Sequence, residues 1–403
     1  MAWAERLVSL WPLNLSHCRE LLASDPDAEF LLHGVEFGFP VTSDAAAVPP
    51  SRCEPYRSVF EHAGAVRAAV QGELALSQVV RPPPGLISPT RHSLGAVPKP
   101  DSGKARPVHD FSQPLGRAVN EHIFHLRRSF PTITDIASTL EPGCYAAKAD
   151  VSGYFMNFPA NPQHWHLLAF LFPAADQGGG LEELWGTRVL FGLRHGPEIA
   201  ERFTQAVVRL MRAHGFTCTY GMLDDFWVQG STEAECWLAW SFLIAILTHL
   251  GFPVNFSPGK SVAPSQQVRM LGVEVDTAAM VLRLGAARVE RLRALVADLV
   301  SAYRRGFPTR PCREISSLLG KLGWASHVLR GGRIFLNHLR ACTLGARSPR
   351  HHVTLNEAAV SDLAWWARAL RGRAGMRCVI GRLDPPLQCQ TDARGQWDSD
   401  SPG

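Results

Sequence analysis

The chain has 403 residues, of which 46% are hydrophobic and 19% charged, and its formal net charge is +5. A chain of this length can form about two or three domains and bury a large core. The small excess of basic residues permits polyanion binding but does not argue for it, so local clusters of charge have to carry that argument.

The cysteines and the N-terminus bear on the cellular compartment. Nine cysteines occur without a CxxC pair or zinc-ligand spacing, which predicts free thiols in a reducing compartment. The N-terminal segment lacks the basic-then-apolar order of a signal peptide. The longest apolar run, Trp237–Leu247, is too short to span a bilayer. We therefore expect an intracellular protein, cytoplasmic or nuclear, without a membrane partner.

Residues 1–85 carry little chemistry and are interpreted as a covering segment. Within them, Ala63–Val80 is expected to be helical and to end at the prolines of Arg81–Pro84.

A basic hairpin is predicted next, within LGAVPKPDSGKARPVHDFSQPLGRAVN, where a DSG turn separates two short strands. It is either an ordinary solvated hairpin or a clamp for a triphosphate, since lysine and arginine neutralise phosphate charge. Its cations are Lys99, Lys104 and Arg106.

A buried strand is predicted at Tyr145–Val151, and it carries the carboxylate of Asp150 near its end. A buried charge is costly unless it is paired or bound to a metal ion. Phe155 follows five residues later, and its ring belongs either to the core or to the floor of a pocket beside that ion. Ala174–Gly180, with three consecutive glycines, is expected to be an exposed loop.

A turn and a helix are expected at and after Val189–Pro197, which reads VLFGLRHGP. Pro197 suits the first helical position and Gly215 the C-terminal cap. Gly192 and Gly196 allow the backbone to approach a ligand closely. A GxxxGP run alone is weak evidence for a site.

The most informative segment is Thr217–Gly230, TCTYGMLDDFWVQG. Its β-branched and aromatic residues predict two strands, with Asp224 and Asp225 at the tip of a hairpin. Acidic pairs are common in turns, but Asp150 supplies a third carboxylate. Hard oxygen ligands favour Mg²⁺, or Mn²⁺ in its place, over zinc. Asp150 and Asp224 lie 74 positions apart (224 minus 150), so only tertiary folding can bring them together.

Two amphipathic helices are expected in the C-terminal part of the chain. The first contains Val289–Tyr303, and Arg288, Arg291 and Arg293 lie on its polar face. The second is Cys312–Leu329. These are either solvated surface helices or a pair whose basic residues follow the phosphates of a nucleic acid.

The order of these segments resembles the successive motifs of reverse transcriptases. The basic hairpin, the strand with Asp150, the Phe-Gly-Leu turn before a helix and the Leu-Asp-Asp hairpin follow one another, and Lys260 and Arg269–Val273 come later. LGAVPKPDSGKARPVHDFSQP and ISSLLGKLGWASHVLRGGR resemble the retrotransposons with a tyrosine recombinase, the DIRS and Ngaro types. The resemblance extends over about residues 21–392.

The resemblance implies an α+β fold of the right-hand polymerase type, in which an antiparallel palm sheet packs on helices. After the covering segment it implies fingers at 86–145, a palm at 146–275 with a fingers insertion near 160–188, a thumb at 276–349 and a connection at 350–387. Residues 388–403 resemble the first strand of a ribonuclease H domain, with Asp392 as its first acid. Only eleven residues follow Asp392 (403 minus 392), so we do not expect that activity.

The resemblance also implies roles for single residues at matching positions. The implied metal ligands are Asp150, Asp224, Asp225 and Val151. The implied nucleotide-binding residues are Lys99 and Arg106 for the triphosphate, Phe155 against a ribose 2′-hydroxyl, and Phe191 and Gly192 in the nucleotide-binding turn. The implied contacts of the primer end are Met222, Met270, Leu271 and Gly272, and Lys260 is the implied acid that protonates the leaving pyrophosphate.

One residue departs from the family pattern, because Met222 stands where a tyrosine is usual and Tyr220 lies two residues earlier. We expect an RNA-directed DNA polymerase that extends a primer on an RNA or DNA template with deoxynucleoside triphosphates. One alternative is a nucleic-acid-binding remnant of a retroelement without catalysis. Another is a polymerase that prefers DNA templates or makes RNA, against which Phe155 argues.

Overall fold

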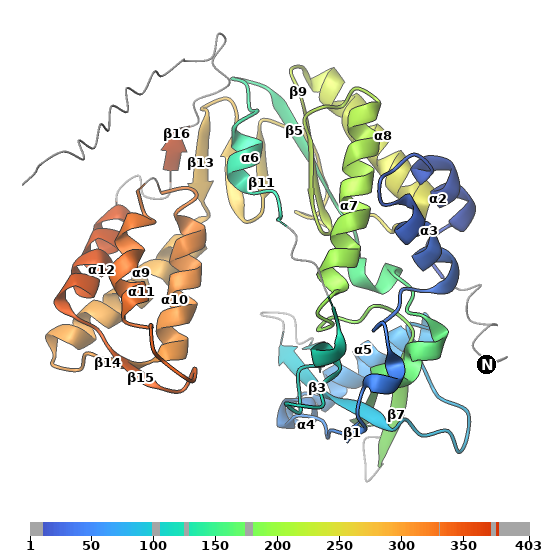
Figure 1. Cartoon of the computed structure of the whole chain (residues 1–403). Helices are drawn as coiled ribbons and strands as arrows, with labels where there is room; N and C mark the ends of the chain where they lie inside the picture. The colour runs from blue at the N-terminus through green and yellow to red at the C-terminus, as the bar shows by residue number, and fades with distance from the viewer. Residues whose placement is uncertain are drawn as a thin grey trace, which may run out of the picture. The chain divides into compact units, whose positions relative to one another are not determined.

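The computed structural model describes residues 11–98, 105–124, 129–173, 180–329 and 331–371, and the backbone of 376–378. The chain divides into two compact units (Figure 1). Unit 1 comprises Met1–Thr132 and Tyr145–Leu271, and unit 2 comprises Ile133–Cys144 and Gly272–Gly403.

A four-stranded antiparallel sheet lies at the centre of unit 1, with the strand order β10-β5-β9-β8. Two long helices, α7 and α8, pack against it (Figure 1). The bounds of these elements are β5 Tyr145–Asp150, α7 Gly196–Ala213, β8 Thr219–Met222, β9 Asp225–Gly230, α8 Glu233–Leu250 and β10 Val262–Ser265. The strand, hairpin and helix predicted around the carboxylates are therefore confirmed, with small shifts at their ends.

Local sequence explains where both helices begin and end. Pro197 occupies the first turn of α7. Thr232 and Glu235 form a reciprocal capping box at the start of α8, and Gly251 ends that helix at φ +97°. Between helices and sheet lies a buried core whose aromatic members include Phe158, Phe203, Phe226 and Phe252.

A second sheet in unit 1 has the order β1-β3-β6-β7-β2, and β4 pairs with β3. Its strands are β1 Ser51–Arg52, β2 Val79–Val80, β3 Thr90–Pro98, β4 Ala105–Asp110, β6 Ala169–Pro173 and β7 Leu181–Gly186. The hairpin β3–β4 confirms the two strands of the predicted basic hairpin. Its turn, residues 99–104, lies outside the described residues. The same holds for residues 174–179 of the predicted loop at residues 174–180.

The helix expected at Ala63–Val80 is shorter than predicted. It is α5 and ends at Ala75, and Ser77 takes a left-handed conformation with φ +51°. Val79 and Val80 then pair with β7 as a strand, because two consecutive β-branched residues suit a sheet better than a helix end. The other elements of unit 1 are α2 Leu15–Leu22, α3 Ala28–Phe37, α4 Arg57–Glu61, the short 3₁₀ helices η1 Ala45–Ala47, η2 Val119–His122, η3 Tyr154–Asn157 and η4 Pro162–Leu168, and β11 Gln267–Met270.

Unit 2 is mainly helical and contains an antiparallel sheet in which β13 pairs with both β12 and β16. The predicted helix around Val289–Tyr303 is α9, whereas the second predicted helix, α10, ends at Ala325 rather than Leu329. Beyond that point most main-chain hydrogen bonds join residues three apart, as between Val328 N–H and the Ala325 carbonyl, rather than four apart as in an α-helix. The elements are α6 Ile133–Ala137, β12 Val273–Asp276, β13 Val281–Leu284, α9 Ala286–Arg304, β14 Thr309–Pro311, α10 Cys312–Ala325, η5 Ile334–Leu336, α11 Asn337–Ala341, β15 His352–Thr354, α12 Glu357–Ala369 and β16 Met376–Cys378.

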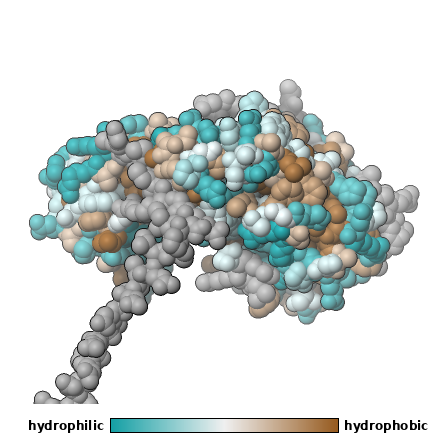
Figure 2. Space-filling model, turned by 90° about the horizontal axis from the view of Figure 1, so that it is seen from above, coloured by the Kyte–Doolittle hydropathy of each residue, from teal (hydrophilic) through white to brown (hydrophobic). Residues whose placement is uncertain are grey.

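The surface mixes polar and apolar side chains. Seen from above, brown apolar patches are interrupted by teal and white ones (Figure 2). Among the described residues, no helix combines the length and the apolar character needed to cross a bilayer.

Candidate active site

The three predicted carboxylates meet at one end of the central sheet of unit 1. Asp150 ends β5 and Asp225 begins β9, and the two residues are directly opposite each other in the antiparallel register. Asp224 precedes Asp225 at the hairpin tip, and its carbonyl accepts a hydrogen bond of 3.0 Å from Val151 N–H. The pairing of β5 with β9 therefore joins residues that lie far apart in the sequence.

Asp150 is almost fully buried and has several polar partners. One carboxylate oxygen, Oδ2, lies 3.1 Å from Nζ of Lys260, and the other accepts a hydrogen bond of 3.1 Å from Asn255 Nδ2. The hydroxyl of Ser261 accepts a hydrogen bond from the Asp150 main-chain nitrogen. The bond to Asp150 is the main reason why the pKa of Lys260 lies above its usual value, so this lysine carries a proton at neutral pH.

Asp224 and Asp225 have different electrostatic surroundings. Burial, followed by the charge of Asp225, raises the pKa of Asp224, and Asp150 adds a smaller repulsion. Asp225 is compensated directly, because Oδ1 lies 2.7 Å from Nζ of Lys148, a buried lysine on β5. The cluster therefore holds three carboxylates and two ammonium groups, Lys148 and Lys260.

The donor chemistry of this cluster suits hard divalent cations. Three carboxylates lie close enough for Asp224 to be affected by the charges of Asp150 and Asp225, and carboxylate oxygens are the ligands that Mg²⁺ and Mn²⁺ prefer. In the part of the chain that the structure describes, no three or more His, Cys, Asp or Glu side chains are already arranged around a single metal position. Ion pairs with lysine take up oxygen atoms of two of the acids instead.

Helix α7 holds the tip of the acidic hairpin. Leu223 has a left-handed conformation with φ +53°, which is strained for a branched side chain. Its N–H donates to Glu201 Oε2 at 3.1 Å, and its carbonyl accepts from Thr204 Oγ1 at 2.7 Å. Gly221 permits this close approach, because a Cβ atom there would lie 2.5 Å from Thr204 Cγ2. Tyr154 completes the contact through its hydroxyl, 2.8 Å from Thr204 Oγ1.

Three of the predicted nucleotide-site residues, Phe155, Phe191 and Gly192, lie together in unit 1. The rings of Phe155 and Phe191 are 4.5 Å apart, and Phe155 is buried whereas Phe191 is 39% exposed. Gly192 has φ +107°, and a Cβ atom there would lie 2.1 Å from the carbonyl oxygen of His109. A side chain at position 192 would therefore push the turn off the β3–β4 hairpin. A Cβ atom at Gly196 would lie 3.3 Å from Cε1 of Phe155, which is a tight contact with a side chain rather than a clash with the main chain.

The structure does not bring the remaining predicted residues into the acidic cluster or the Phe155–Phe191 pair in the same clear manner. Arg106 is exposed on β4 opposite Val97, whereas Lys99 lies outside the described residues. Met270 is buried, so its side chain belongs to the interior. Leu271 and Gly272 form a turn with φ +50° and +76°, and a Cβ atom at Gly272 would lie 2.6 Å from Nη1 of Arg288. Met222 is half-buried beside the acidic hairpin.

Several residues that support the site were not predicted as site residues. Lys148 had a readable signal, because a charged residue within an apolar strand and two positions before Asp150 shares its face. Glu201 and Asn255 had no such signal, since nothing local in the sequence links Glu201 to Leu223 or Asn255 to Asp150.

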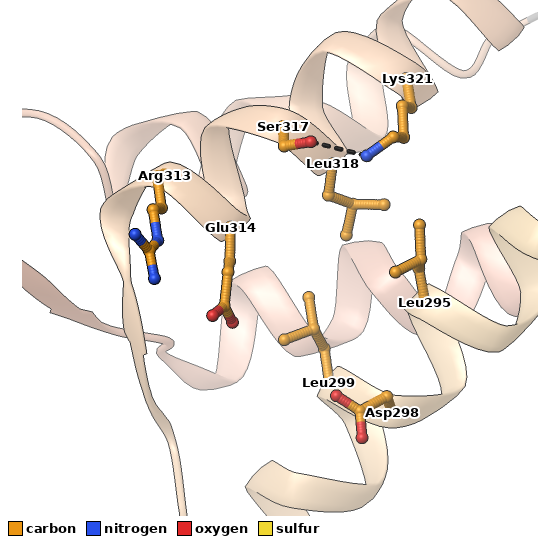
Figure 3. Close-up of a pocket in the computed structure, with 8 residues that line it drawn as sticks. All are labelled: Leu295, Asp298, Leu299, Arg313, Glu314, Ser317, Leu318 and Lys321. Atoms are coloured by element: carbon orange, nitrogen blue, oxygen red, sulfur yellow. Dashed lines mark hydrogen bonds between the residues drawn. The ribbon is translucent and has the colours of Figure 1, made fainter. Parts of the chain in front are cut away.

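A cavity of about 420 Å³ lies in unit 2, between α9 and α10. The side chains of Leu295, Leu299 and Leu318 line it together with polar residues at its edges (Figure 3). Lys321 at one edge donates to Ser317 Oγ at 2.6 Å. None of the three acids that meet at β5 and β9 lines this cavity.

Comparison with known proteins gives a fold but no family. No protein-family model matches the chain, and no curated protein matches it. Three matching structures are of the foamy viral protease–reverse transcriptase, two in complex with double-stranded DNA (one of them the form termed dRH) and one with an RNA/DNA hybrid. All three share 18% identity with this chain.

The matches cover most of this chain but only part of the foamy viral chains. The TM-scores are 0.60 and 0.58 for the two DNA complexes and 0.59 for the hybrid complex, and each match covers 88% of this chain. This chain spans 59%, 71% and 46% of those three chains, in the same order. The chain therefore has a mixed α/β fold that resembles that of a retroviral reverse transcriptase.

Proposed function

We propose that this protein is an RNA-directed DNA polymerase that extends a primer with deoxynucleoside triphosphates. The observation that carries the proposal is the meeting of Asp150, Asp224 and Asp225 at the end of the β5–β9 pair. Its support is the reverse transcriptase-like fold. In this proposal the central sheet with α7 and α8 is the palm, the β3–β4 sheet belongs to the fingers, and α9 and α10 form the thumb.

The acids would hold two divalent ions, Mg²⁺ or Mn²⁺, which when bound activate the primer 3′-hydroxyl and balance charge on the triphosphate. Asp150 and Asp224 provide oxygen ligands, with Asp225 beside them and the main-chain carbonyl of Val151 nearby. Lys260 is half-exposed, so its ammonium group is free to leave Asp150 and donate a proton to the departing pyrophosphate.

The proposed substrate contacts are those that the sequence motifs imply. Lys99 and Arg106 bind the triphosphate, and the turn at Phe191 and Gly192 supports the sugar and base. Phe155 excludes a ribose 2′-hydroxyl. Met222 and the turn at residues 270–272 contact the primer end, while the template is RNA or DNA. We assign the chain to the tyrosine-recombinase retrotransposons on the motifs noted above.

A second candidate is a nucleic-acid-binding remnant of a retroelement that no longer catalyses synthesis. The observation in its favour is Met222 at the position where reverse transcriptases usually carry tyrosine. The tail that resembles ribonuclease H lies outside the described residues.

Primer extension on an RNA template, with deoxynucleotides and Mg²⁺, tests the proposal. We expect extension by the parent and a loss of at least ~10³-fold in Asp224→Asn, because a ligand of the transition-state cations is removed. Asp298→Asn, an exposed acid on α9, is the matched control and should extend normally. Salt-sensitive primer–template binding without extension by the parent would favour the remnant instead, and absence of both would contradict both proposals.

A further inference from the structure

Two lysines compensate the acidic cluster, and they differ in their freedom to move. Lys260 lies after α8, and its side chain is 51% exposed. Lys148 lies in the middle of β5, and its side chain is only 9% exposed. The indole Nε1 of Trp240 on α8 donates to the Lys148 carbonyl at 3.0 Å, so main chain and side chain of this residue are both held.

The sheet register explains the partner of Lys148. Lys148 is opposite Trp227 and Asp150 is opposite Asp225. Alternate residues of a strand share one face, so Lys148 lies diagonally next to Asp225 on the face that carries both acids. The resulting distance of 2.7 Å between Nζ and Oδ1 is that of a close, largely buried ion pair.

Separating this pair is unfavourable mainly for Lys148, whose side chain is 9% exposed, whereas that of Asp225 is 22% exposed. An unpaired buried charge costs far more than an exposed one. If Asp225 held a divalent cation, the Lys148 ammonium group would remain buried close to that cation and would repel it. Lys260 does not impose this restriction on Asp150, because its exposed side chain can reach water.

We propose that Lys148 is a positioning residue that keeps Asp225 in place with its charge compensated, so that Asp150 and Asp224 alone hold the divalent ions. This rests on the proposed function of the site and divides the acidic pair into a metal-binding Asp224 and a lysine-bound Asp225. The hairpin carboxylates then have unequal tasks although they are neighbours in sequence.

Mn²⁺ binding to the full chain, measured by electron paramagnetic resonance without nucleic acid or nucleotide, tests this division. Asp224→Asn should weaken Mn²⁺ binding by ~10-fold or more, whereas Asp225→Asn should change it by less than ~3-fold, because ligand charge sets affinity. Lys148→Met should tighten binding, since it releases the Asp225 carboxylate. Equal weakening by the two asparagine variants, or Mn²⁺ binding that Lys148→Met leaves unchanged, would overturn the proposal.

Thermal unfolding of a double-mutant cycle provides a readout that does not involve metal. Lys148→Met and Asp225→Asn should each lower the midpoint, and the double variant should recover most of the loss, because no charged group of the pair is then left without its partner. Purely additive losses would contradict the pairing. Arg283→Met breaks the comparable pair with Asp276 in unit 2 and should lower stability without a change in Mn²⁺ binding. If Lys148→Met does not fold, the double variant and the two asparagine variants still test whether Lys148 and Asp225 form a pair and whether Asp225 holds a cation.

The two proposals can fail separately. A parent chain that does not extend primers but shows the expected Mn²⁺ pattern would remove the polymerase proposal and keep the role of Lys148. A parent that extends primers, with Mn²⁺ binding lost equally in Asp224→Asn and Asp225→Asn, would do the reverse.

Discussion

Burial determines how several single side chains behave in this molecule. Asp224 has a raised pKa because it is removed from water next to two other acids, and Lys148 requires its partner for the same reason. Glu73 on α5 is a second case outside the site, because burial raises its pKa to about 7. One of its carboxylate oxygens is buried without a hydrogen-bond partner among the described residues.

Glu73 makes the stability of the chain depend on pH. Its pKa in the folded state, about 7, lies above the ordinary value of 4.5, so folding binds a proton. The favourable contribution is complete below pH 4.5 and is lost as pH rises through 7. It amounts to on the order of 3 kcal/mol. Glu73→Gln should remove this slope and raise the thermal midpoint at pH 8, measured from pH 4.5 to 8. The exposed Glu54→Gln is the control, and an unchanged slope in Glu73→Gln would exclude this assignment.

Phe155 should determine the choice of sugar. Replacing it by valine opens space beside Phe191, so we expect the preference for deoxynucleotides over ribonucleotides to fall by at least ~10-fold. The measurement is kcat/KM for both nucleotide types on one primer–template. Phe158→Val, in the core, should cost about 1–3 kcal/mol of stability without a change in preference. An equal change in both variants would show that Phe155 is only a core residue.

At the scale of elements, helix α7 and the β8–β9 hairpin act as one assembly. Glu201 and Thr204 on α7 bind both polar main-chain groups of Leu223, and Gln205 joins them by donating to Glu201 Oε1 at 2.7 Å. These bonds offset the strain of the left-handed residue at the tip. The position of Asp224 therefore depends on a helix as well as on its own hairpin.

Glu201→Ala should disturb this assembly. It leaves the partly buried Leu223 N–H without its acceptor, which costs about 1–3 kcal/mol, and lets the hairpin tip move. We expect kcat for primer extension to fall by ~10-fold or more with little change in KM for the nucleotide. Glu201→Gln, which keeps an acceptor oxygen, should recover part of the rate. Glu198→Ala, one turn earlier and paired with Arg202, should not affect kcat, and a loss there of equal size would point to general damage to α7.

At the scale of the whole molecule, the distribution of charge bears on the proposed nucleic-acid binding. The formal net charge is only +5, so the nucleic-acid binding that we propose requires local basic surfaces, for which α9 is the candidate. Not all arginines of α9 are equally available: Arg288 stacks on Trp324 at 4.0 Å, and Arg293 pairs with Glu290. Arg291 is exposed on the same helix.

Primer–template binding should therefore depend on salt. We expect affinity to fall by at least ~10-fold between about 50 and 200 mM salt, and Arg291→Ala to reduce the slope of log K against log salt by about 1. Fluorescence anisotropy over a salt series measures both. Arg57→Ala, an exposed arginine on α4 paired with Glu61, is the control. A slope that Arg291→Ala leaves unchanged would identify α9 as an ordinary solvated helix.

Local sequence predicted the elements around the acidic hairpin because their signals act over a few residues. β-Branched and aromatic runs placed the hairpin at Asp224, and Pro197 and Gly215 placed α7 within two residues at each end. The same reasoning failed at Ala63–Val80, where pairing of Val79 and Val80 with β7 ended the helix early. That pairing partner lies about a hundred residues away, beyond the reach of any local pattern.

By itself the sequence determined which carboxylates are available and in what order their motifs follow, since these depend only on residue type and spacing. The tertiary structure alone decided that Asp150 faces Asp225, that Lys148 compensates one acid and Lys260 another, and that Glu201 holds Leu223. Sheet register and helix packing set these contacts, and both result from burying the whole core at once rather than from the preferences of neighbouring residues.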